Sequence, residues 1–123
     1  EDPLIREIVD AALEVQSHLG GGLLKSAYEV AMLHELTLRG ISVNRGHSSE
    51  IAYRGRPIVT RREIPLVVDD RVLVACFCVE QLEAIHLARQ QSLLRVARAE
   101  CGLCLNFHSH ALDAEMERIL PPT

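Results

Sequence analysis

The chain has 123 residues, of which 48% are hydrophobic, and this suits a single domain, residues 1–123, with one core. Its net charge of −4 and its 3% of aromatic residues disfavour non-specific nucleic-acid binding and a base-stacking surface. No stretch approaches the roughly 20 apolar residues of a membrane span, and the acidic first residues differ from a signal peptide. We therefore expect a soluble, cytoplasmic protein that does not associate with membranes.

Two amphipathic helices are predicted in the first third of the chain. In residues 3–19, apolar side chains recur at spacings of three to four, and Pro3 suits the first helical turn. The glycines at positions 20–22 end that pattern, and a second apolar ladder then predicts a helix over residues 23–39. Gly40 is a natural end for this second helix.

The middle of the chain changes to a pattern that predicts strands. Two turn-forming pairs, Arg54-Gly55 and Asp69-Asp70, separate short apolar runs and therefore predict tight hairpins. Residues 71–79 are apolar on both faces, which is typical of a strand at the centre of a sheet. The other predicted strands cover residues 41–44, 50–53, 56–59 and 63–68.

The last third of the chain predicts a helix, a strand and a second helix. The helix over residues 82–98 is long enough for a crossover, so we expect the strand at 101–107 to lie parallel to the strand at 71–79. Residues 111–120 predict a short closing helix. The predicted fold class is α/β, with a mixed β-sheet flanked by α-helices.

Five short motifs are spread over nearly the whole chain. They are LGGGLLKSAYE at residues 19–29, LTLRG at 36–40, YRG at 53–55, LVVDDRVLV at 66–74 and GLCLNF at 102–107. In this order they resemble the GxxExxY family of PD-(D/E)xK nuclease-like proteins. The resemblance implies a restriction-endonuclease-like fold. It also implies metal-dependent cleavage of phosphodiester bonds, with carboxylates that hold Mg²⁺.

The residues of the implied site depart from the family's pattern. Lys25 stands where the pattern has its first glutamate, and Pro65 stands where it has an aspartate before a strand. Ala75 and Phe77 replace the Glu-x-Lys pair of the next strand, and Arg89 replaces a glutamine on the following helix. The two cations repel Mg²⁺, and the other three side chains supply no oxygen ligand. Together these departures predict a lost catalytic site.

A catalytically inactive domain that acts as a binding or assembly module is therefore the first hypothesis. It needs no cofactor, and its partner is an unknown protein or a second copy in a homodimer. One alternative is a divergent Mg²⁺-dependent nuclease with migrated acids, since Glu63 shares a strand face with Pro65. Another is an anion or small-ligand site in the former active-site pocket. The pocket positions are Lys25, Tyr28, Glu63, Pro65, Ala75, Phe77, His86 and Arg89.

Four cysteines raise the possibility of a zinc site. Tetrahedral zinc needs four converging ligands. Cys76 and Cys78 share one face of their predicted strand, whereas Cys101 and Cys104 fall on opposite faces of theirs. Reduced thiols that pack in the core are therefore the favoured interpretation, and no bound metal is expected.

A basic hairpin is the weaker candidate for contact with nucleic acid. Its arginines are either a solvated surface or a patch for phosphates or an acidic partner. His108 and His110 follow a strand and are interpreted as an exposed loop rather than a metal pair. The hairpin arginines are Arg54, Arg56, Arg61 and Arg62.

Overall fold

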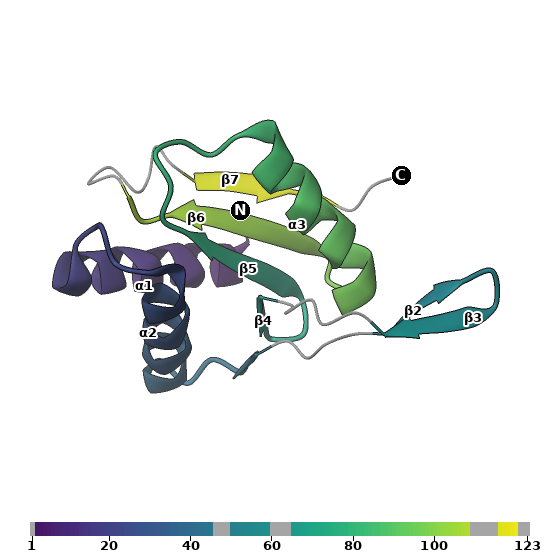
Figure 1. The fold of residues 1–123 in the computed structure, drawn as a ribbon. Coiled ribbons are helices and arrows are strands. Elements are labelled where there is room, and N and C mark those ends of the chain that lie inside the picture. Colours follow the sequence, from purple (N-terminus) through teal and green to yellow (C-terminus); the bar gives the residue numbers. More distant parts are fainter. Residues whose placement is uncertain (1, 46–49, 60–64, 109–115, 121–123) are drawn as a thin grey trace.

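The computed structural model describes residues 2–45, 50–59, 65–108 and 116–120, and they form a mixed sheet between helices (Figure 1). Within these residues the main sheet has the strand order β1-β4-β5-β6-β7. Its strands are β1 (Val43–Asn44), β4 (Leu66–Val68), β5 (Val72–Phe77), β6 (Cys101–Asn106) and β7 (Met116–Ile119). The helices are α1 (Pro3–Leu19), α2 (Lys25–Leu38) and α3 (Ala84–Ala97). This arrangement confirms the predicted α/β fold class.

The central strand pair is parallel, as the crossover helix predicts. Val72 lies beside Cys101 at one end of the β5–β6 ladder, and Phe77 lies beside Asn106 at the other. The remaining neighbours in the main sheet, β1–β4, β4–β5 and β6–β7, are antiparallel. Every residue of β5 is buried, because helices cover this strand on both faces.

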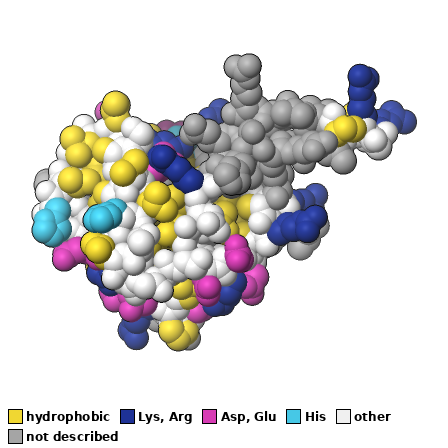
Figure 2. Space-filling model, turned by 90° about the horizontal axis from the view of Figure 1, so that it is seen from below, with side chains coloured by type: hydrophobic (Ala, Val, Ile, Leu, Met, Phe, Trp, Pro, Cys, Tyr) yellow, Lys and Arg dark blue, Asp and Glu magenta, His cyan; other side chains and the backbone are white. Residues whose placement is uncertain are grey.

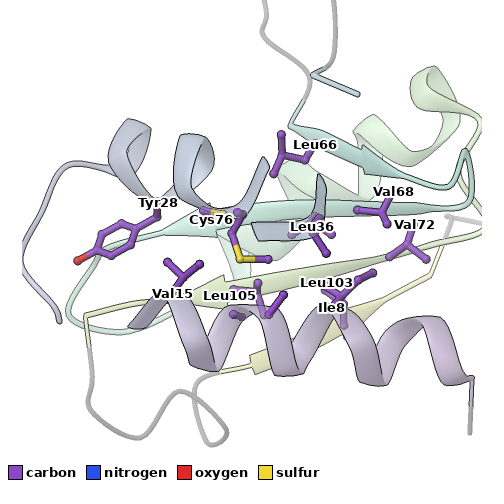
Figure 3. Close-up of a cluster of buried hydrophobic side chains, with 14 of the residues drawn as sticks. Ile8, Val15, Tyr28, Leu36, Leu66, Val68, Val72, Cys76, Leu103 and Leu105 are labelled. Atoms are coloured by element: carbon purple, nitrogen blue, oxygen red, sulfur yellow. The ribbon is translucent and has the colours of Figure 1, made fainter. Parts of the chain in front are cut away.

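Two hydrophobic cores lie on the two faces of the sheet. The α1–α2 core joins both N-terminal helices to one face of β5 and β6 (Figure 3). The α3 core joins the third helix to the other face. Among the members of the α1–α2 core are Ile8, Val15, Tyr28, Leu36, Val74, Cys76, Leu105 and Phe107. The α3 core consists of Leu73, Ala75, Phe77, Leu93, Leu94, Ala99, Cys104 and Ile119.

The helix α1 begins with a well-formed cap. The Asp2 carboxylate accepts a hydrogen bond of 2.9 Å from the Leu4 amide, and Pro3 occupies the first turn. This hydrogen bond is the main reason that the pKa of Asp2 lies below its ordinary value, and Arg71 lowers it further. The predicted bounds of this helix are confirmed.

The strand β5 ends at Phe77 because a side chain then takes over the hydrogen bonds of the backbone. The amide of Val79 donates to Asn106 Oδ1 at 3.1 Å, and Asn106 Nδ2 donates to the Val79 carbonyl at 2.8 Å. The side-chain amide of Asn106 therefore holds the start of the connection that leads to α3.

Both predicted tight turns are present. Arg54 and Gly55 have φ values of 51° and 81°, and Asp69 and Asp70 have 53° and 55°. Positive φ at both central residues is typical of the hairpin turn whose twist matches its strands. The first turn joins β2 (Glu50–Tyr53) to β3 (Arg56–Val59), which pair in a separate two-stranded sheet. This arm extends away from the main sheet, with arginine side chains at its tip (Figures 1 and 2).

The predicted closing helix at residues 111–120 is wrong where the structure describes it. Met116–Ile119 forms β7, antiparallel to β6, with Leu105 opposite Met116 and Gly102 opposite Ile119. The apolar spacing of this segment fits a helix, but β6 offers a free edge, and β7 satisfies its backbone groups. Gly102 also leaves the space that the Ile119 side chain occupies, since a Cβ atom there would lie 2.9 Å from Ile119 Cγ1.

No helix among the described residues has the length and apolarity that crossing a membrane requires.

Candidate functional site at the end of β5

Two of the predicted pocket positions lie side by side in the sheet. Leu66 pairs with Val74 across the β4–β5 ladder, so the preceding residue, Pro65, lies level with Ala75. Both side chains are buried, and Ala75 belongs to the α3 core. Pro65 has no amide hydrogen to donate, so the paired part of β4 begins after it. Pro65 and Ala75 are therefore neighbours across the β4–β5 pair.

Phe77 is the point where three elements meet. It follows Ala75 on the same face of β5, and 8% of its surface is exposed. Lys25 Nζ, from the first residue of α2, lies 5.5 Å from the centroid of the Phe77 ring. The His86 ring, from the first turn of α3, lies 5.4 Å from the same ring at an angle of 59°. Lys25, Phe77 and His86 therefore form one cluster, the Phe77 cluster.

The Phe77 cluster carries a positive charge from Lys25. Lys25 makes no ion pair within the described ranges 2–45, 50–59, 65–108 and 116–120. It begins α2, whose first turn contains no acidic residue, and the helix dipole places positive potential at the same end. The face of an aromatic ring attracts a cation, so Phe77 offsets part of this unfavourable placement.

His86 is held in one tautomer by its own helix. Its Nδ1 accepts a hydrogen bond of 2.9 Å from the Glu83 amide. A neutral imidazole that accepts at Nδ1 carries its proton on Nε2. The Nε2–H group of His86 is therefore a hydrogen-bond donor beside Phe77. Arg89 follows three residues later on α3 and is exposed.

The structure separates Tyr28 from the Phe77 cluster. Its ring is fully buried in the α1–α2 core and stacks on Phe107, with centroids 4.5 Å apart. Its hydroxyl donates to the Gly20 carbonyl at 2.8 Å and accepts from the Leu23 amide at 3.1 Å. Burial raises the pKa of this hydroxyl. Tyr28 therefore fixes the connection between α1 and α2, while Glu63 lies outside the described residues.

Glu29 is a carboxylate that the sequence interpretation did not consider. It is half-buried, one helical turn after Lys25. Burial raises the pKa of the Cys76 thiol, the negative charge of Glu29 raises it further, and the positive charge of Lys25 lowers it. Glu29 and Lys25 thus both act electrostatically on β5. The spacing of four from Lys25 is the signal that would have indicated this carboxylate.

The four cysteines lie on the sheet faces that the alternation of side chains along their strands predicts. Cys76 and Cys78 contact the α1–α2 core, as does Cys101, whereas Cys104 belongs to the α3 core. All four are free thiols, and burial raises the pKa of Cys104 to about 12. In the part of the chain that the structure describes, no three His, Cys, Asp or Glu side chains are grouped to hold a metal ion. His110 lies outside that part.

These features define an α/β domain, with a mixed sheet covered on both faces and a cluster of side chains at the end of its central strand. The family model of the PD-(D/E)XK nuclease superfamily matches residues 2–119, and the chain belongs to this superfamily. Comparisons with curated proteins and with solved structures give no match.

Proposed function

We propose that this chain is a catalytically inactive nuclease-like domain of the GxxExxY type that acts as a binding or assembly module. The observation that supports the proposal most is the contact between Lys25 and Phe77. In the family's pattern these two positions carry a glutamate and a lysine. Here an ammonium group lies over an aromatic ring, 5.5 Å from its centroid, so a cation stands in place of the metal-binding carboxylate and an apolar ring in place of the lysine.

The surrounding positions support the same interpretation. Magnesium is held by oxygen ligands, most often carboxylates, with waters completing an octahedron. Pro65 and Ala75 are buried and offer no side-chain oxygen, and Phe77 adds apolar bulk beside them. A second cation close to Lys25 would experience electrostatic repulsion at short range.

A cleavage assay tests the proposal directly. Single- and double-stranded DNA and RNA would be incubated with the protein in Mg²⁺ and in Mn²⁺, beside the variants Glu29→Gln, Glu63→Gln and Lys25→Met. We expect all four samples to show the same background. Metal-dependent cutting by the parent chain that either glutamine variant abolishes would overturn the inactive-domain proposal.

The divergent nuclease is the alternative that such a result would establish. Glu29 favours it, because this carboxylate is half-buried and its charge acts on β5. Glu63, two residues before Pro65 in the sequence, remains the other candidate acid. In this alternative, Mg²⁺ is the cofactor, and Lys25→Met is expected to increase cutting because it removes a competing positive charge.

Anion binding in the former active-site pocket is the other alternative. The Lys25 ammonium and the Nε2–H group of His86 lie around the same ring, and both are hydrogen-bond donors that an anion can accept from. Arg89 adds a guanidinium group on the same helix as His86. Titration with inorganic phosphate, followed by ¹H–¹⁵N chemical shifts, would move the resonances of Lys25 and His86 if this alternative holds. Uniform small shifts in the parent chain and in His86→Ala would exclude it.

The remaining partners are proposals with tests of their own. If the chain forms a homodimer, its apparent molecular mass in analytical ultracentrifugation should increase with protein concentration. Contact of the arm with nucleic acid would rely on Arg54 and Arg56, whose side chains are exposed next to the equally exposed Tyr53. Such binding would weaken steeply with added salt, because phosphate contacts release counterions.

A further inference from the structure

Within the described ranges, β7 is an edge strand of the main sheet. It pairs with β6 on one side and is the last strand in the order β1-β4-β5-β6-β7 (Figure 1). Among the residues that the structure describes, the backbone of Met116–Ile119 makes no hydrogen bond other than those with β6. Unpaired amide and carbonyl groups along an edge are a template for another strand.

A groove runs beside this edge, between β7 and α1. Its volume is about 410 Å³. Apolar side chains from α1, β6 and β7 form its floor, and charged side chains of both signs stand at its rim. Across the described portion of the chain, these rim charges make no ion pair. The charged side chains at the rim are Arg6, Asp10 and Arg118, and Glu117 also lines the groove.

We propose that β7 binds an extended segment of a partner protein as an added antiparallel strand. Edge pairing supplies backbone hydrogen bonds, and the alternate side chains of the added strand supply specificity. The groove then receives the side chains on the α1 side of that strand. The inference rests on the binding-module function, for which it supplies a docking surface away from the Phe77 cluster.

The residues of β7 determine which side chains the partner segment needs. Arg118 lies opposite Leu103 and faces the groove, whereas Glu117 lies opposite Cys104 and faces the α3 side. Directly opposite residues of an antiparallel pair share a face, and opposite charges there are favourable. The segment therefore places an acidic residue opposite Arg118, a basic residue opposite Glu117, and apolar residues opposite Met116 and Ile119. From N- to C-terminus its pattern is apolar, acidic, basic, apolar.

A second copy of this chain fits the edge less well than such a segment. Two copies of one edge strand can pair antiparallel about a two-fold axis that is perpendicular to the sheet. The two sheets then present the same face, and residues that lie opposite each other must point to the same side. This requires one residue of the strand to lie on the axis, opposite its own copy. In β7 that residue is Glu117 or Arg118, and it would lie opposite its own copy in the second molecule. Like charges directly opposite each other are destabilising. Charge complementarity thus favours a different chain.

A pair of labelled peptides tests the inference with the folded full chain. One carries Val-Glu-Lys-Val between threonines, and the other carries Val-Lys-Glu-Val, so their composition and net charge are the same. Fluorescence anisotropy would measure both affinities. We expect the first peptide to bind more tightly by about fivefold or more. It places opposite charges against Glu117 and Arg118, whereas the second peptide places like charges there.

The matched variant exchanges the two charges of β7. Glu117→Arg combined with Arg118→Glu keeps the net charge, and we expect it to reverse the preference between the peptides. Arg56→Glu on the arm is the control and is expected to leave the preference unchanged. Equal binding of both peptides, an absence of binding, or a preference that the exchange leaves intact would overturn the inference.

Dimerisation through β7 and failure of the binding-module function would each give a different result from the peptide assays. A dimer of the parent chain that the charge exchange alters would assign the edge to a second copy and would overturn the partner-segment proposal. Failure of the binding-module function is recognised separately, by metal-dependent cutting in the nuclease assay. Far-UV circular dichroism would establish that each variant is folded before it is compared.

Discussion

The two faces of the main sheet differ in how completely they are packed. On the α1–α2 side, large side chains such as Tyr28, Leu36 and Phe107 are fully buried, and the two rings stack (Figure 3). On the α3 side, the central position of β5 is Ala75, and Gln90 of α3 is buried, with no hydrogen-bond partner for its Oε1 atom among the described residues. The first face holds most of the largest fully buried side chains, whereas the second contains Ala75, Phe77 and His86, three of the candidate site positions.

The largest expected effect comes from removing a large side chain on the α1–α2 side. Leu36→Ala deletes a fully buried side chain and leaves a cavity between α2 and the sheet. We expect a loss of about 2–5 kcal/mol in the free energy of unfolding, measured by urea denaturation. Leu93→Ala on α3 is the matched variant, and we expect a smaller loss there. Equal losses would contradict the difference between the two faces.

The next effect tests the packing between β6 and β7. Gly102→Ala would place a Cβ atom 2.9 Å from Ile119 Cγ1 and 3.2 Å from Leu94 Cδ2. We expect a loss of about 1–3 kcal/mol in the free energy of unfolding, because the Ile119 side chain has to move.

Ile119→Ala provides the control for this contact. It removes the atoms that clash with the added Cβ, so adding Gly102→Ala in that background should cost less than it does in the parent chain. If Gly102→Ala costs the same in both backgrounds, Ile119 does not pack over Gly102, and the assignment of β7 loses its support.

This contact also shows which parts of the fold the sequence can predict. α1 and the parallel β5–β6 pair follow from local patterns, since an amphipathic stripe and a crossover helix determine them. β7 does not follow, because Met116 and Ile119 are spaced as well for a helix as for a short strand. Only the free edge of β6 and the gap at Gly102 favour the strand, and both are tertiary features.

The candidate site was predictable to a similar degree. Pro65 and Ala75 lie level because the hairpin at Asp69-Asp70 sets the register between β4 and β5. The role of Tyr28 was not predictable, because its hydroxyl bonds to Gly20 and Leu23, and its ring stacks on Phe107 from a distant strand end. The position of Glu29 beside β5 likewise depends on how α2 packs on the sheet.

A gain in stability is expected on the α3 side at Gln90. Gln90→Met keeps a similar volume and removes a buried carbonyl oxygen that has no hydrogen-bond partner in the described part of the chain. We expect the free energy of unfolding to rise by about 1 kcal/mol, since an unsatisfied buried acceptor costs about 1–3 kcal/mol. Thermal denaturation by circular dichroism would show the shift. The same change at Gln16, on the α1–α2 side, should destabilise the protein because Gln16 Nε2 donates to the Phe107 carbonyl.

The smallest expected effect is the coupling between Lys25 and Phe77. Replacing Lys25 alone combines two opposing contributions, since a cation is unfavourable at a helix N-terminus and favourable over an aromatic face. A double-mutant cycle with Lys25→Met and Phe77→Leu isolates the second contribution. We expect a coupling energy of about 0.5–1 kcal/mol, in keeping with a cation–π contact near the surface. A coupling energy of zero would mean that the lysine merely lies beside the ring, and the inactive-domain proposal would then depend on Pro65 and Ala75 instead.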